Sequence, residues 1–398
     1  MIIQTKDEHQ KRNATTYPDL HPSLESQFRV TDIDNRLLGG IQKQNSLDNA
    51  KFNGCLTSYN GELLLAYRAY SHKLNGRSNI FITRLTSSLG VKENIELDLP
   101  AYSPTNRQYE DPRLFIHRGK LHVSYVAVEY EDGHGGQTKW WAAMHVVRLD
   151  RNLKVEEHFL TRFDGNGVDN RQKNWVYFSH EGQLYCIHDT RCHRLLKLDD
   201  KLQVIDVTVS HDIQWPRGHM RGGTTPLPLG DGKYLSLLHS SVDHNQRIRR
   251  YSMTPYIFTI DKILSIGRTI HASTENPIVD PTATWWHPIV VFPMGIVERQ
   301  DSYLVSVGVN DLYTTILEWP KDDLMRMRPA DEFYTFQPRY FYWPKCTNTA
   351  KFSHYKILKV GGQGTVICGC VDNPENYAWI NENIRGLEWI SEEEYNNL

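Results

Sequence analysis

One short pattern recurs five times along the chain: a tight turn followed by a run of residues typical of a β-strand. The copies span residues 60–67, 118–125, 181–187, 231–238 and 300–307. Gly61, Gly119, Gly182, Gly232 and Asp301 mark the turns, and subtracting their numbers gives separations of 58, 63, 50 and 69 residues. Glycine or Asp in the turn and apolar residues after it are typical of a β-hairpin. The repeat therefore predicts a chain built from similar β-units.

A second element follows several of these hairpins. It consists of another strand-like run, a polar turn and a closing apolar residue, as in 147–153, 196–202 and 258–264. Several strands per repeat, at a period a little above 50 residues, are typical of propeller blades. Five copies predict an all-β, five-bladed propeller. A helical solenoid is disfavoured because long runs with a 3.6-residue period are missing.

Composition limits the partners and the compartment. The 45 basic and 47 acidic residues nearly cancel, so no nucleic-acid partner is expected. Residues 1–45 are predicted to be an N-terminal extension, and residues 46–398 a catalytic propeller domain with a C-terminal tail. The polar segment 1–19 lacks the apolar run of a signal peptide, and no transmembrane segment is expected. The six cysteines lack a paired zinc-binding spacing, which favours free thiols and a cytoplasmic location. The oligomeric state is left open.

Polar residues precede each turn, in the segments expected to form the innermost strands. In a propeller these strands line one channel, so their side chains converge. The candidates are Asn53, Asp111 with Arg113, Lys173 with Asn174, Arg221, and the expected turn 292–295 followed by Asp311.

The strongest local motif is Tyr109-Glu110-Asp111-Pro112-Arg113. A carboxylate can act as a general acid, and an adjacent Arg can hold an anionic or hydroxylated ligand through two hydrogen bonds. The alternative is a surface turn with an ion pair.

Four cationic residues are predicted to meet near this motif: Arg68, Lys173, Arg221 and His239. Arg and Lys give phosphate charge-assisted hydrogen bonds, so such a cluster favours a phosphate or sugar-phosphate ligand. The alternative is that nearby carboxylates, such as Asp169, Asp189 and Asp243, pair with these cations individually.

The order of these motifs resembles a known group of enzymes. Segments 110–113, 221–226, 239–240 and 291–295 look like the successive motifs of glycoside hydrolase family 130 and of the related glycosyltransferase family 108, the β-mannosyl phosphorylases and transferases. The likeness to family 108 is the stronger one, because segment 173–175 followed by 184–188 fits that second group well. Segment 307–311 also resembles a late motif of the family, so the resemblance covers roughly residues 45–320. One departure is Met294, where the family usually has Cys.

The resemblance implies a five-bladed propeller and an inverting reaction with Asp111 as the catalytic acid, in which a sugar hydroxyl can relay the proton. It implies phosphate binding by Arg68, Lys173, Arg221 and His239, together with a tyrosine that is either Tyr251 or Tyr256. Sugar contacts are implied for Asn53 and Asp311, and we also expect substrate contacts from Tyr109, Arg113 and Asn174.

The predicted function is a β-mannoside phosphorylase or β-mannosyltransferase that uses phosphate or mannose 1-phosphate. Phosphate takes the place of the attacking water, so no second carboxylate is needed as a base. No cofactor is expected, and no metal, because the segments that carry the resemblance contain no Asp-x-Asp pair. Two alternatives stay open: a transferase that uses GDP-mannose, and a carbohydrate-binding propeller without catalysis.

Overall fold

The computed structural model describes residues 29–32, 51–71, 77–100, 107–132, 138–163, 172–210, 212–213, 215, 220–245, 248–271, 288–309, 313–336, 339–343, 354–359, 365–371 and 388–390. Within these residues the chain is built almost entirely from β-strands, which confirms the all-β prediction. No helix in the described segments is long and apolar enough to cross a membrane.

The first eight long strands form one sheet made of two antiparallel groups. The first group contains β2 (Lys51–Tyr59), β3 (Glu62–Ser71), β4 (Arg77–Leu85) and β5 (Val91–Glu96). The second contains β6 (Arg107–His117), β7 (Lys120–Asp132), β8 (Thr138–Leu149) and β9 (Val155–Thr161). A single parallel pair, Ser78 with Gln108, joins β4 to β6.

Three further sheets continue the pattern. One contains β10 (Val176–His180), β11 (Gln183–Asp189), β12 (Arg194–Leu198) and β13 (Val204–Thr208). The next contains β15 (Leu227–Gly230), β16 (Lys233–Asn245), β17 (Ile248–Phe258), β18 (Ile263–Gly267) and β24 (Met327–Pro329), and β19 (Ile270–His271) and β20 (Pro288–Ile289) pair with β17. The last contains β21 (Val291–Glu298), β22 (Ser302–Val309), β23 (Tyr313–Pro320) and β1 (Arg29–Asp32).

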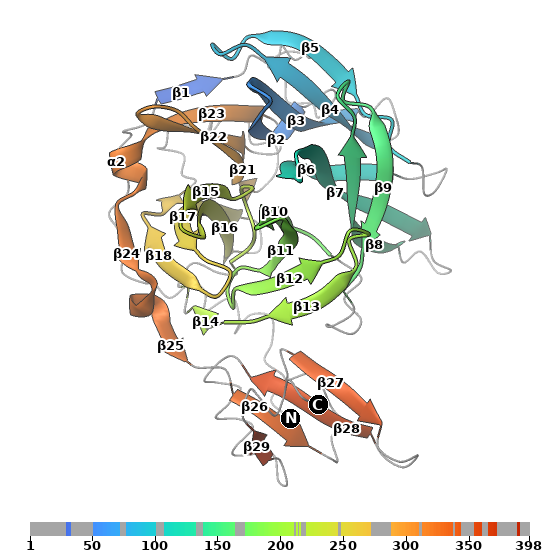
Figure 1. The fold of residues 1–398 in the computed structure, drawn as a ribbon, viewed down its shortest axis with the longest axis vertical. Helices are drawn as coiled ribbons and strands as arrows, with labels where there is room; N and C mark the ends of the chain where they lie inside the picture. Colours follow the sequence, from blue (N-terminus) through green and yellow to red (C-terminus); the bar gives the residue numbers. More distant parts are fainter. Residues whose placement is uncertain are drawn as a thin grey trace.

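These sheets are arranged around a common centre, with β2, β6, β10, β15 and β21 innermost (Figure 1). Strand β1 runs antiparallel to β23, so this part of the predicted N-terminal extension belongs to the last sheet of the ring. The division of the chain at residue 45 otherwise stays a prediction.

The C-terminal elements follow the last sheet of the ring. The short helix α2 (Lys321–Leu324) and the 3₁₀ turn η3 (Ala330–Phe333) flank β24, and β25 (Tyr334–Phe336) pairs with β14 (Asp212–Ile213). Strands β26 (Arg339–Trp343), β27 (His354–Lys359), β28 (Thr365–Val371) and β29 (Glu388–Ile390) form a separate sheet at the bottom of Figure 1.

The recurring turns join each innermost strand to the next strand outward. In the first, Asn60 and Gly61 have φ angles of 51° and 79°, and Arg118-Gly119, Glu181-Gly182 and Asp231-Gly232 repeat the two positive angles. Two positive φ angles define the type I′ turn, whose twist matches that of the strands on either side. Four of the five predicted turns are therefore type I′ turns, and the fifth, at Asp301, joins β21 to β22 without positive φ angles.

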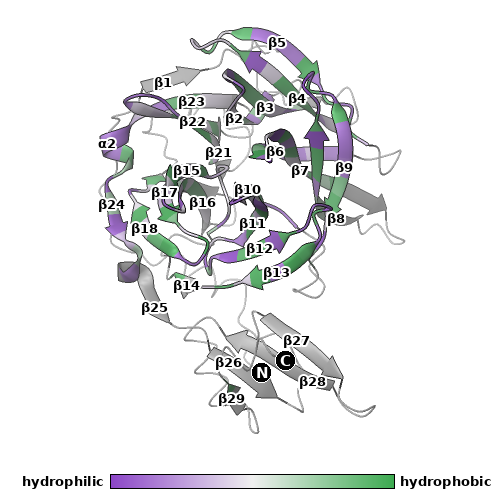
Figure 2. Cartoon of the chain, viewed as in Figure 1, coloured by the Kyte–Doolittle hydropathy of each residue, from purple (hydrophilic) through white to green (hydrophobic). Residues whose placement is uncertain are grey.

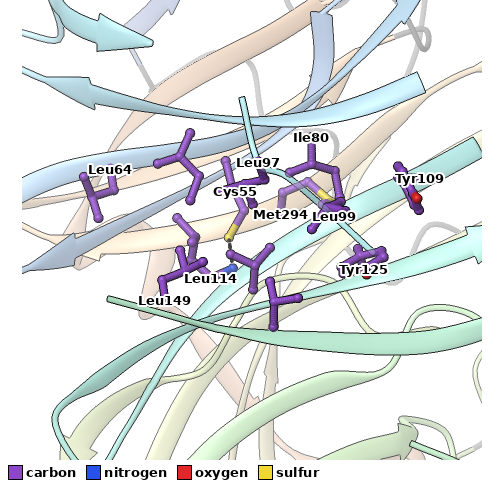
Figure 3. Packing of buried hydrophobic residues seen from close by; sticks show 14 of the residues in the cluster. Cys55, Leu64, Ile80, Leu97, Leu99, Tyr109, Leu114, Tyr125, Leu149 and Met294 are labelled. Atoms are coloured by element: carbon purple, nitrogen blue, oxygen red, sulfur yellow. Dashed lines mark hydrogen bonds between the residues drawn. The ribbon is translucent and has the colours of Figure 1, made fainter. Parts of the chain in front are cut away.

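The core lies between neighbouring sheets. Apolar side chains from the first two strand groups and from β21 pack together, as Cys55, Leu114 and Met294 do in Figure 3. The backbone N–H of Leu114 donates to Cys55 Sγ at 3.2 Å, and burial raises the pKa of this thiol to about 11. Cys55 is therefore a packing residue with little thiolate character. By contrast with this core, outer strands such as β5 and β9 carry mixed hydrophilic and hydrophobic residues in Figure 2.

Buried histidines make the fold sensitive to acid. His145 on β8 shares one proton with His158 on β9, with 2.8 Å between Nδ1 and Nε2. Burial, reinforced by the nearby His158 and Arg162, lowers the pKa of His145 to about 4. Burial likewise lowers the pKa of His122 and of His193 to about 4.

We expect stability to fall as the pH drops from 6.5 towards 4. In the unfolded chain these imidazoles regain a pKa near 6.5, so in this window the unfolded state binds more protons than the folded one. Each such group lowers the free energy of unfolding by up to about 1.4 kcal/mol for each pH unit of acidification in this window. Thermal unfolding between pH 7.5 and 4 measures the slope, and His145→Gln should make it shallower. A wild-type Tm that stays constant across this window would contradict the prediction.

Candidate active site

Three predicted site residues share an unusual backbone conformation. Asn53, Asp111 and Asn174 have φ angles of 54°, 51° and 64°. Among non-glycine residues, Asn and Asp adopt this left-handed region most readily. Asn53 and Asp111 also lie where the pairing register shifts, in β2–β3 and β6–β7 respectively. Bulges of this kind redirect a side chain, so local backbone geometry places these residues at the innermost strands.

Asn53 and Asp111 contact each other across two strand groups. Asn53 Nδ2 donates to Asp111 Oδ1 at 2.8 Å, and Asn53 is 4% exposed. Gly308 on β22 faces the Asn53 amide so closely that an added Cβ would lie 1.9 Å from Asn53 Oδ1. Only glycine leaves room for this amide, and the contact holds the Asp111 carboxyl group in a fixed place.

Gly308→Ala tests this arrangement without touching the acid. The new methyl group must displace the Asn53 side chain and break its hydrogen bond to Asp111. We expect a loss of turnover of about tenfold or more, the value of one hydrogen bond to a charged group. Circular dichroism and Tm measurements check the fold, and a variant with wild-type kcat would show that Asn53 does not orient Asp111.

Glu110 binds two of the predicted phosphate-binding cations. Its Oε1 lies 3.2 Å from Arg68 Nη2, and its Oε2 lies 2.6 Å from Lys173 Nζ. Arg68 also donates to Gln108 Oε1 at 3.3 Å and lies 5.0 Å from the centre of the Phe52 ring. Asp169, Asp189 and Asp243 were the carboxylates expected from the sequence as individual partners of the cations, and Asp169 lies outside the described residues. The structure adds Glu110 as a carboxylate shared by Arg68 and Lys173.

The two carboxylates of the motif differ in electrostatics. Burial raises the pKa of Glu110, but Arg68 and Lys173 outweigh it and leave the pKa below its usual value. Glu110 is therefore ionised at neutral pH and poorly suited to donate a proton. The structure describes no ion pair for Asp111, which has the Asn53 amide as its side-chain partner.

Arg113 is placed differently from the prediction of a substrate contact. Its side chain is 1% exposed, and its Nε donates to the carbonyl of Gly223 at 2.8 Å. Its Nη2 donates to Gly222 O at 3.4 Å, and its guanidinium lies 5.4 Å from the centre of the Phe292 ring. Arg113 therefore joins β6 to residues 222–223, in the segment before β15, as a buried structural contact.

His239 and Tyr251 lie together on the next sheet. Gly222 O can only accept, so its 2.9 Å contact with His239 Nδ1 places a proton on that nitrogen. The ring of His239 stacks on Tyr251, with 6.1 Å between centroids. Tyr256 is fully buried within a core cluster, and burial raises its pKa. Of the two tyrosines that the sequence left open, Tyr251 is therefore the one beside His239.

Arg221 is the least constrained cation of the four. Its backbone forms a bridge with His239, with Arg221 N to His239 O at 2.9 Å and His239 N to Arg221 O at 3.1 Å. Within the described part of the chain, its guanidinium has no partner. It can therefore bind an anion without first breaking an ion pair.

The remaining predicted residues have varied placements. Tyr109 is 8% exposed, and its hydroxyl donates to Pro100 O at 3.2 Å. Its ring packs in the core, on the face of β6 opposite to that of Glu110. The carbonyl of Asn174 lies 2.3 Å from a Cβ added to Gly222, so the two segments touch. Asp311 lies outside the described residues. Segment 292–295, expected as a turn, lies within β21, where a register shift follows Pro293.

Comparison with known proteins agrees with this geometry. A family model described as β-1,4-mannooligosaccharide phosphorylase matches residues 27–329. The chain belongs to glycoside hydrolase family 130. The family 130 match includes β1 and every strand of the ring, as well as the Asp111 motif. The resemblance drawn from the order of motifs is thus confirmed.

Individual relatives of this family 130 chain are distant. A β-1,2-mannobiose phosphorylase from Listeria innocua is 21% identical over 323 residues, which cover 65% of this chain and 86% of that protein. The solved β-1,2-mannobiose complex of a Listeria innocua β-1,2-mannobiose phosphorylase has a TM-score of 0.50 at 15% identity, covering 75% of this chain and 98% of the other. A structure of family 130 glycoside hydrolases that target β-1,2-mannosidic linkages in Candida mannan has a TM-score of 0.51 at 13% identity, covering 79% and 98%. At these identities the structures support the fold.

Proposed function

We propose that this family 130 member is an inverting β-mannoside phosphorylase, or a β-mannosyltransferase that runs the same step in reverse from mannose 1-phosphate. The observation that carries the proposal is the separation of the two adjacent carboxylates. Glu110 takes the cations Arg68 and Lys173, whereas Asp111 contacts the neutral amide of Asn53. One carboxyl group is thus available for proton transfer beside a group of cations.

The proposed step uses these groups in separate roles. Phosphate attacks C1 of the mannosyl unit, the bond from C1 to the glycosidic oxygen breaks, and Asp111 supplies the proton to the leaving oxygen, directly or through a sugar hydroxyl. Attack from the opposite face inverts the anomeric centre and needs no second carboxylate. Lys173, Arg221, His239 and Tyr251 would hold the phosphate, and Asn53 and Asn174 would face the sugar. Asp311 is proposed as a further sugar contact on the basis of its motif.

We also propose that the ring is a five-bladed propeller. A cavity of about 370 Å³ supports this count, because every innermost strand or the segment leading to it contributes to its wall. The wall includes residues 56–58, 115–116, 178–179, 225–228 and 296–298. Hydrogen bonds from Gly54 N to Thr314 Oγ1 at 3.0 Å and from Leu56 N to Ser306 Oγ at 2.9 Å join the first sheet to the last.

A donor assay separates the phosphorylase from a GDP-mannose-dependent transferase and from a binding protein. The purified chain is incubated with a panel of β-mannosides, with and without phosphate, and separately with mannose 1-phosphate or GDP-mannose and mannoside acceptors. We expect phosphate-dependent formation of mannose 1-phosphate, and release of phosphate in the reverse direction. Release of GDP would identify the nucleotide-sugar alternative, and binding without turnover would overturn the enzymatic proposal.

A further inference from the structure

Glu110 occupies a position that the proposed reaction does not use. Its two carboxylate oxygens contact cations from two distant segments, Arg68 on β3 and Lys173 just before β10. Glu110 itself lies on β6, the strand between them, next to Asp111. A carboxylate that is neither the acid nor the base, yet contacts two of the four predicted cations, can act through those neighbours.

We infer that Glu110 is a positioning residue that sets the affinity of the site for phosphate. This inference rests on the proposed function and assigns a role within the same site. Arg68 and Lys173 both contact one carboxylate, so the two cations lie close enough to repel each other. The negative charge of Glu110 cancels this repulsion and fixes both cations beside β6.

The surroundings make this pair more than a surface ion pair. The side chains of Glu110 and Arg68 are only 13% and 12% exposed, so water screens their charges weakly. Arg68 is further fixed by Gln108 and by the Phe52 ring. Lys173 is 30% exposed, so its ammonium group can reach a ligand while it contacts Glu110.

Loss of the charge at Glu110 should therefore weaken the binding of phosphate and leave the binding of the mannoside nearly unchanged. In Glu110→Gln the side chain keeps its shape, but its amide cannot neutralise two cations. Lys173, the more exposed and more flexible of the two, should move away from Arg68. The site then loses one charged hydrogen bond to phosphate, which weakens binding about ten- to a hundredfold.

The test compares three variants by calorimetric titration with inorganic phosphate and by steady-state kinetics on a β-mannoside. Glu110→Gln should raise the Kd and the KM for phosphate at least about tenfold and change the KM for the mannoside less than about twofold. Glu110→Asp keeps the charge and should recover part of the affinity. Glu156→Gln breaks the outer ion pair with Arg148, 3.1 Å between Nε and Oε2, and should match the wild type.

The outcomes separate this inference from the proposed function. Unchanged or tighter phosphate binding by Glu110→Gln, with the wild type binding phosphate normally, would overturn the role of Glu110 alone. If the wild type binds no phosphate and shows no phosphate-dependent turnover, the proposed function itself fails, and the role of Glu110 fails with it. Equal losses for phosphate and mannoside would indicate a general structural defect and would also overturn the inference. Tm measurements on all three variants confirm folding.

Discussion

Asp111→Asn should remove nearly all turnover and leave the fold intact. The asparagine keeps the shape of the side chain, and its Oδ1 can still accept the hydrogen bond from Asn53 Nδ2, which is 2.8 Å long in the wild type. It cannot deliver a proton to the leaving oxygen. General acid catalysis is typically worth about 10²- to 10⁴-fold, so kcat on a β-mannoside should fall by this factor.

A matched control is Asp200→Asn, which removes an exposed carboxylate paired with Arg118 far from the site. This variant should retain wild-type kinetics, and both variants should retain the wild-type Tm. Wild-type kcat for Asp111→Asn would rule out Asp111 as the acid. Glu110 is a weak substitute in that event, because Arg68 and Lys173 favour its ionised form.

Arg221→Ala should weaken the binding of phosphate or mannose 1-phosphate much more than the binding of the other sugar substrate. Arg221 meets His239 through backbone hydrogen bonds, which the alanine variant retains. The substitution therefore removes the guanidinium and keeps the local pairing. Loss of one charged hydrogen bond is worth about 1.5–3 kcal/mol, which predicts a ten- to hundredfold rise in the KM for the phosphate substrate.

The control for Arg221→Ala is Arg118→Ala, which removes an exposed guanidinium from the turn between β6 and β7. The KM for phosphate should not change in this control. An unchanged phosphate response in Arg221→Ala would contradict the proposed phosphate site. Mannoside cleavage at full rate in phosphate-free buffer would exclude a phosphorylase and leave a hydrolase or a nucleotide-sugar transferase.

Much of the local structure follows from the sequence. The Asn60-Gly61 turn and its later copies carry residues that tolerate positive φ angles, and the apolar runs after them have few alternatives to a strand. The innermost position of Asn53 and Asp111 could also be predicted, because every innermost strand precedes such a turn. The left-handed backbone at these residues was missed, although an Asn followed by Gly and an Asp at a strand interruption are signals for it.

Other site features depend on contacts between distant segments. Arg113 looked like a ligand for substrate, yet its guanidinium is bound by carbonyls more than a hundred residues away. Tyr109 belongs to the same motif, but the alternation of the strand turns it into the core. Sequence order cannot reveal such contacts, because an exposed Arg and a buried one have the same local sequence.

The repeating β-hairpins, the family and the types of the candidate site residues can all be predicted from the sequence. Those properties depend on local chemistry: turn preference, alternation along strands and the order of motifs. Only the tertiary structure shows which distant groups meet: Glu110 between Arg68 and Lys173, and Asn53 on Asp111. Each of these contacts joins different strands, and its geometry depends on how the sheets pack around their common centre. That packing separates two adjacent carboxylates of similar chemistry into an ionised support and a candidate acid.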